Sequence, residues 1–193
     1  MIELPASPAP RSVSPRLIDY GFIIRGASSL RIERPGSRWA LDVEYPPMKL
    51  VDSYDFVALL SRAKSEGLKV RVPTLIPQSI QGTPTVLGSG QTGNRLALQG
   101  FQTNPNYELR AGFWFTIDEG ENAYLHQVAQ TTTSNAGEAT VEINPPLRAK
   151  HPNGTPARFD VPFIQGFIAS DDWSWTVPVN GLIAPTFTVE EYR

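Results

Sequence analysis

Residues 39–72 read WALDVEYPPMKLVDSYDFVALLSRAKSEGLKVRV, and this stretch predicts one strand, one helix and a second strand. Apolar and polar residues alternate from Trp39 to Tyr45, which is typical of a half-buried strand. Pro46-Pro47 ends that strand because proline cannot donate to a ladder. The apolar residues that follow recur at helical spacing: Phe56, Leu59, Leu60 and Ala63.

The ends of this helix carry signals of their own. Asp52 or Ser53 is expected to cap the first turn, and Gly67 to close the last. Residues 68–72 then alternate again and predict the second strand. One helix packed on a β layer is therefore expected in a chain whose other segments predict strands and turns.

The composition excludes several classes of function. The chain has 193 residues, of which 40% are hydrophobic and 19% charged, and its net charge is −2. It therefore has no general attraction to nucleic acid or to an anionic membrane. It contains no cysteine and two histidines, so disulfides, thiol chemistry and a structural zinc site are not expected, and no cofactor is predicted.

Hydropathy indicates no membrane partner. No apolar run is long enough to span a bilayer, and residues 1–15 lack the apolar core of a signal peptide. The expected compartment is the cytosol of the producing cell, or a particle assembled there.

The order of segments predicts a discontinuous, mainly β architecture. Residues 1–16 are rich in proline and predict an extended N-terminal arm. Residues 17–78 and 161–193 are expected to share one β core, a β-sandwich-like layer that bears the helix. The intervening residues 79–160 carry short strand signals separated by turns, which predicts an inserted small β-barrel.

The sequence contains no GxSxG, Walker A or HExxH pattern. Gly88, Gly90 and Gly93 have GxGxxG spacing, but no apolar helix pattern follows to direct a helix N-terminus at phosphate, so this stretch is interpreted as a flexible β-turn. His126 lies in an expected strand and is interpreted as a hydrogen-bonded structural residue, whereas His151 precedes a proline in a turn and is expected to be solvated. The adjacent carboxylates Asp171-Asp172 are not expected to form a catalytic pair, because adjacent residues of one strand face opposite sides. They are interpreted as a turn and the start of a strand over residues 173–179. Glu190-Glu191 is interpreted as a solvated strand end.

Two sets of side chains are candidates for binding. Trp114, with Tyr107, is a candidate glycan contact, because flat aromatic faces suit sugar rings. Trp114 alternates with Phe113 and Phe115 and is therefore expected to be exposed. Basic residues of the first segment are candidates for a ring or channel surface, or simply for the solvated face of a sheet: Arg31, Arg34, Arg38, Lys69 and Arg71.

Several short motifs, taken in order, resemble the distal tail proteins of tailed, siphophage-like bacteriophages. The matching motifs are 32–48 (IERPGSRWALDVEYPPM), 90–93 (GQTG), 109–115 (LRAGFWF), 124–128 (YLHQV), 144–148 (NPPLR) and 187–191 (FTVEE).

The resemblance implies a β-sandwich-like belt domain with one helix, made from both chain ends, and an inserted barrel of the OB type or related to sugar-binding modules. It also implies a structural virion protein at the tail tip, without catalysis, that assembles in the host cytoplasm. Its partners would be further copies of itself in a hexameric ring, the tail tube protein, the tail-tip hub protein and the tape measure protein. DNA would pass through the ring without sequence-specific recognition. A carbohydrate-binding module for host attachment is the alternative, and a glycosidase or peptidase is a third hypothesis.

Overall fold

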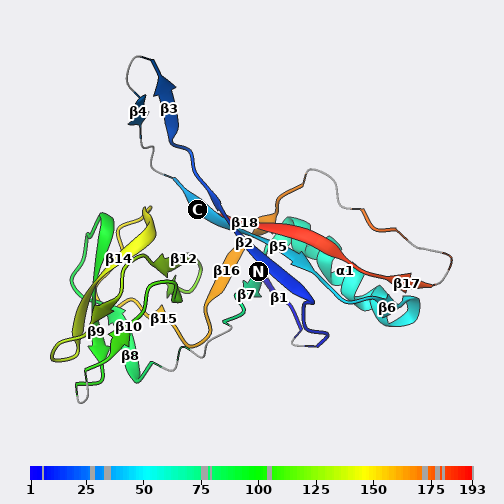
Figure 1. Cartoon of the computed structure of the whole chain (residues 1–193). Helices are drawn as coiled ribbons and strands as arrows, with labels where there is room; N and C mark the ends of the chain where they lie inside the picture. Colours follow the sequence, from blue (N-terminus) through cyan, green and yellow to red (C-terminus); the bar gives the residue numbers. More distant parts are fainter. Residues whose placement is uncertain are drawn as a thin grey trace.

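The computed structural model confirms the predicted fold class, mainly β with one α-helix (Figure 1). It describes residues 1–5, 7–26, 29–32, 36–74, 78, 80–103, 106–170, 174–176, 179 and 181–192. The elements are β1 (Ile2–Glu3), β2 (Ser12–Ile18), β3 (Phe22–Arg25), β4 (Ser29–Ile32), β5 (Arg38–Glu44), β6 (Met48–Lys49), α1 (Leu50–Glu66), β7 (Leu68–Arg71), β8 (Gly82–Val86), β9 (Gly93–Phe101), β10 (Glu108–Leu109), β11 (Trp114–Asp118), β12 (Ala123–Val128), β13 (Thr132–Thr133), β14 (Glu138–Leu147), β15 (Ala157–Arg158), β16 (Phe163–Ile168), β17 (Leu182–Ile183) and β18 (Thr186–Glu191).

The first sheet draws its strands from both ends of the chain. Its six strands follow the order β1-β7-β16-β18-β5-β2, and only the β1–β7 pair among them is parallel. Helix α1 packs against this sheet through Phe56, Leu60 and Ala63, which belong to one core with Leu41 and Val189. Strands from residues 2–71 and 163–191 thus bury one hydrophobic core together.

Residues 1–16 are not the separate arm that the sequence predicts. Ile2 pairs with Leu68 in β7, and β2 pairs with β5 along its whole length, from Ser12 opposite Glu44 to Ile18 opposite Arg38. These pairings give the proline-rich segment both edge strands of the sheet. The edge position also explains why a strand accepts Pro15, since a proline at an edge removes no ladder bond.

The helix begins earlier than its expected caps. Lys49 is its N-cap residue and makes no side-chain capping bond, so the prediction of a cap at Asp52 or Ser53 is wrong. Ser53 is buried inside the first turn and donates to the Leu50 carbonyl at 2.7 Å. The prediction for Gly67 is confirmed: it has φ +73° and its N–H donates to the Ala63 carbonyl.

The second sheet is a nearly closed, barrel-like layer built from residues 82–158. Its order is β15-β11-β12-β14-β9-β8, and Thr85 in β8 bridges to Pro156 beside β15. Strand β14 runs through Pro145-Pro146, and its register with β9 shifts there, between Glu142 and Leu147.

Three two-stranded sheets complete the fold in the described residues: β3–β4, β6–β17 and β10–β13. Strands β3 and β4 form a ribbon that projects beyond the first sheet as a continuation of β2 and β5 (Figure 1). A strand was expected over residues 173–179, but the described residues Ser174–Thr176 lie outside any strand. Trp173 lies outside the described residues.

Candidate functional surfaces and the junction between the two sheets

The outer face of the barrel-like sheet packs directly on the first sheet. Trp114 and Thr116 of β11 share that face with Leu125 of β12, because Thr116 and Leu125 are opposite each other in the register. Thr116 Oγ1 donates to the Phe163 carbonyl at 2.7 Å and accepts from the Phe163 N–H at 2.8 Å. The ring of Trp114 lies edge-on to that of Trp39 in β5, with centroids 4.6 Å apart.

A buried carboxylate lies at the centre of this junction. Glu191, the last residue of β18, accepts hydrogen bonds from the backbone N–H groups of Trp39 at 2.8 Å and Leu125 at 2.7 Å. Arg148, which follows β14, donates Nη2 to the same carboxylate at 2.8 Å. We call these four residues the Glu191 cluster. Through Trp39 and Leu125, β5 of the first sheet and β12 of the second sheet both donate hydrogen bonds to the Glu191 carboxylate. The cluster therefore fixes the position of the two sheets relative to each other.

Burial dominates the electrostatics of this cluster. The side chains of Glu191 and Arg148 are 0% and 7% exposed. Burial raises the pKa of the Glu191 carboxyl, whereas Arg148 and the two backbone N–H groups act in the opposite direction. Arg148 also lies over the ring of Tyr124, 5.5 Å from its centroid. The interpretation of Glu191 as a solvated strand end is therefore wrong, while Glu190 forms an ion pair with Arg38.

The two histidines are both buried. His126 in β12 is held by the Pro145 carbonyl, 2.9 Å from Nδ1, as a structural histidine was expected to be. His151 is only 1% exposed, so its expected solvation is wrong. Its Nδ1 lies 2.9 Å from Glu119, and its ring meets Tyr124 edge-on.

The two candidate glycan contacts do not form one platform. Trp114 is half-buried at the junction, so the expectation that it is exposed is corrected: the outer face of the barrel is covered by the first sheet. Tyr107 packs on the other core, and partial burial raises the pKa of its hydroxyl. At Trp114, part of the aromatic surface that sugar stacking would use is thus taken up by the contact with Trp39.

The basic candidates are dispersed over the first sheet. Arg38 donates to the Tyr20 hydroxyl at 2.6 Å and lies on β5, whereas Lys69 and Arg71 lie on β7, with β16 and β18 between the two strands. The Lys69 ammonium lies over the ring of Phe163, 5.1 Å from its centroid. The Arg31 side chain and Arg34 fall outside the described residues. The described members therefore form no single basic patch.

Among the described residues, no group of three or more His, Asp and Glu is placed to hold a metal ion. An open groove on the face of β2, β5 and β18 is polar, but its carboxylates are engaged: Asp42 accepts from Thr188 at 2.6 Å and Glu44 from Ser12 at 3.2 Å. Asp171 and Asp172 lie outside the described residues.

Gln78, in the connection between β7 and β8, is buried against the barrel-like sheet and carries a testable expectation. Its Nε2 donates to the Trp114 carbonyl at 2.6 Å and the Phe159 carbonyl at 2.9 Å, and its Oε1 accepts from the Trp114 N–H at 2.7 Å. Gln78→Ala leaves these backbone groups buried without partners, so we expect a loss of about 2–3 kcal/mol in urea unfolding. Gln91→Ala, which removes a similar amide near the surface within one sheet, is the matched control and should cost less; equal losses would contradict this expectation.

Two comparisons with known proteins gave no match for this chain. No protein-family model matches it, and no curated protein sequence matches it. Within the described part of the chain, no helix combines the length and the apolarity that crossing a membrane requires.

Proposed function

We propose that this chain is a structural protein of a phage tail, a distal tail protein that forms a hexameric ring at the end of the tail tube. In this role its first sheet with α1 is the belt domain, and residues 79–160 are a domain inserted into it. The ring joins the tube to the tail-tip hub, contacts the tape measure protein and lets DNA pass. It has no catalytic step, and it assembles in the host cytoplasm before it functions in the virion.

The observation that carries the proposal is the division of the chain between its two large sheets. One core is built from residues near both ends of the chain, and the barrel-like sheet is built from the residues between them. This is the arrangement that the resemblance implies. The hydrogen bonds of the Glu191 cluster support the proposal further, because they fix the two sheets relative to each other and ring closure requires a defined subunit conformation.

The open edges of the first sheet suit assembly. β1 and β2 are its edge strands, and an unpaired edge is a surface on which another chain can pair. Head-to-tail contacts between identical subunits generate a closed ring when the rotation between neighbours closes.

Native mass spectrometry and negative-stain electron microscopy of the full chain test the proposal. We expect a closed ring of six copies with an open centre, at micromolar concentration. A protein that stays monomeric across the accessible concentration range would overturn the ring. If that monomer also bound glycans in an array, it would favour the carbohydrate-binding alternative.

A further inference from the structure

Three buried polar side chains lie around Tyr124 in the barrel-like sheet: His126, Arg148 and His151. Tyr124 and His126 are two residues apart on β12, so they share its inner face, where the His126 ring lies 5.7 Å from that of Phe115. The His151 ring meets the Tyr124 ring edge-on at 5.0 Å, and the Arg148 guanidinium lies 5.5 Å from the centroid of the same ring. The three side chains are therefore neighbours, although they come from β12 and from the segment that follows β14.

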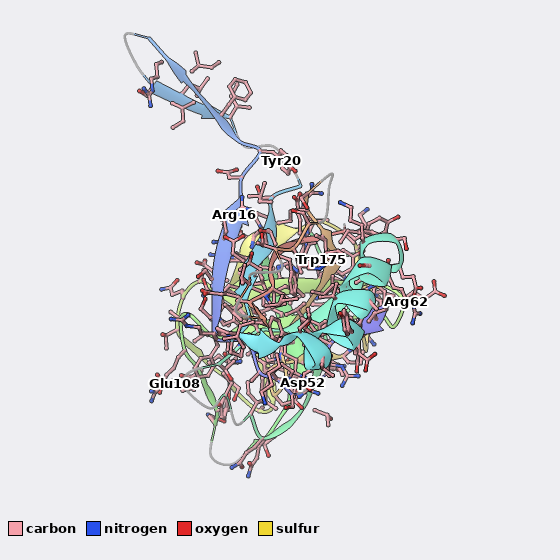
Figure 2. The ribbon with its side chains drawn as sticks, turned by 90° about the vertical axis from the view of Figure 1, so that its right-hand side faces the viewer. Arg16, Tyr20, Asp52, Arg62, Glu108 and Trp175 are labelled. Carbon is pink, nitrogen blue, oxygen red and sulfur yellow. The ribbon has the colours of Figure 1, made fainter. Side chains whose placement is uncertain are left out.

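Each of these three side chains has polar atoms without a protein partner. His126 Nε2, His151 Nε2 and both Nε and Nη1 of Arg148 are shielded from solvent and make no hydrogen bond with the described residues. Figure 2 shows the opposite situation for Arg62 and Glu108, which lie at the outside of the body, where water reaches their polar atoms. Buried polar groups in folded proteins are almost always paired, because an unpaired one keeps the full cost of its desolvation. The four nitrogen atoms therefore require a partner that the polypeptide does not supply.

The hydrogen bonds of the two rings decide which kind of partner fits. His126 Nδ1 lies 2.9 Å from the Pro145 carbonyl, which can only accept, so Nδ1 carries the proton and Nε2 of the neutral ring is an acceptor. His151 Nδ1 lies 2.9 Å from a carboxylate oxygen of Glu119, and Nε2 of its neutral ring is likewise an acceptor. The two Arg148 nitrogen atoms can only donate. The partner must therefore accept from the guanidinium and donate to the imidazoles.

The charges around these atoms favour a neutral partner. The Arg148 charge is already paired with the Glu191 carboxylate at 2.8 Å, and an anion has no proton to donate to His126 Nε2. A metal ion could bind the two imidazoles, but it would lie near the guanidinium, and like charges repel strongly in a buried site. Burial, and then the Arg148 charge, lower the pKa of His126 to about 3, and the same charge opposes a bound cation. Water is neutral and both donates and accepts, so it meets every requirement.

We propose that the barrel-like sheet holds a buried water site between Arg148, His126 and His151. Water there accepts from the unpaired guanidinium N–H groups and donates to the Nε2 atoms of the two rings. Because Arg148 also donates to Glu191, this water extends the hydrogen bonds of the Glu191 cluster from the junction into the interior of the barrel. The inference concerns the single chain and does not depend on the proposed ring.

A high-resolution crystal structure of the full wild-type chain tests the water site directly. We expect an ordered water within about 2.7–3.2 Å of Arg148 Nε or Nη1 and of at least one of the Nε2 atoms of His126 and His151. Crystals soaked in bromide distinguish water from an anion, because bromide at this position would give an anomalous signal. Bromide bound there, or apolar side chains packed directly on the four nitrogen atoms, would overturn the proposal.

Magnetic relaxation dispersion of oxygen-17 water provides a second measurement, because its amplitude counts the long-lived water molecules inside a protein in solution. His126→Phe keeps a ring of similar shape but removes the Nε2 acceptor, so we expect the amplitude to fall by at least one water molecule. Arg95→Met removes an exposed side chain from the same sheet and should keep the wild-type amplitude. An amplitude that is unchanged in His126→Phe, or a wild type without long-lived water, would overturn the proposal. If His126→Phe does not fold, the wild-type amplitude and the wild-type crystal structure decide.

Discussion

Arg148→Met is expected to destabilise the chain by about 3–5 kcal/mol, one of the largest effects of a single substitution outside the apolar core. The variant keeps the length of the side chain but leaves the Glu191 carboxylate buried with only the N–H groups of Trp39 and Leu125 as partners. Removing one member of a buried pair costs far more than the pair contributes, because the remaining charge stays desolvated. The free energy of unfolding from urea titration measures the loss.

An exposed ion pair in the same protein serves as the matched control. Arg95 and Glu142 are 3.1 Å apart, with side chains 72% and 35% exposed. Arg95→Met should cost less than about 1 kcal/mol. Glu191→Gln with Arg148→Met should then cost less than the sum of the two single changes, because no unpaired charge remains. A loss at Arg148 no larger than that at Arg95 would show that the Glu191 cluster does not hold the sheets together.

The burial of Glu191 could have been predicted from the alternation of residues along its strand, but the sequence interpretation did not use this signal. Phe187 and Val189 are buried, and period two places Glu191 on the same face of its strand as these two residues. The charge and the position near the end of the strand favoured the solvated interpretation. A carboxylate on the buried face of a strand is in fact a signal that a cation and amide donors lie nearby.

Other features depend on contacts that periodicity does not contain. The face of Trp114 that points away from the barrel would be exposed in a separate domain, and only the approach of Trp39 covers it. The pairing of Ile2 with β7 is likewise a contact between distant segments, to which local composition is insensitive. The strand–helix–strand stretch from Trp39 could be predicted because its signals are local.

His126→Asn is expected to change how stability depends on pH. Burial, and then the nearby charge of Arg148, lower the pKa of His126 to about 3. Its Nδ1 is directed at the Pro145 carbonyl, and its Nε2 has no hydrogen-bond partner among the described residues, so the neutral ring is the form that fits. In the unfolded chain this histidine takes up a proton below about pH 6.5. Lowering the pH from there toward 3 therefore favours the unfolded state.

The expected loss in the free energy of unfolding follows from the same proton linkage. Between pH 6.5 and pH 4.5 the wild type should lose about 2–3 kcal/mol through this one group. The Asn amide can still donate to the Pro145 carbonyl, but it does not titrate, so that part of the pH dependence should vanish in the variant. Carboxylates contribute equally to both proteins, and the difference between their urea midpoints isolates His126. NMR of the labelled histidine ring provides an independent readout: the His126 signal should remain that of a neutral ring at pH 4.5, and protonation near pH 6.5 would contradict the closed, cationic environment that Arg148 creates around it.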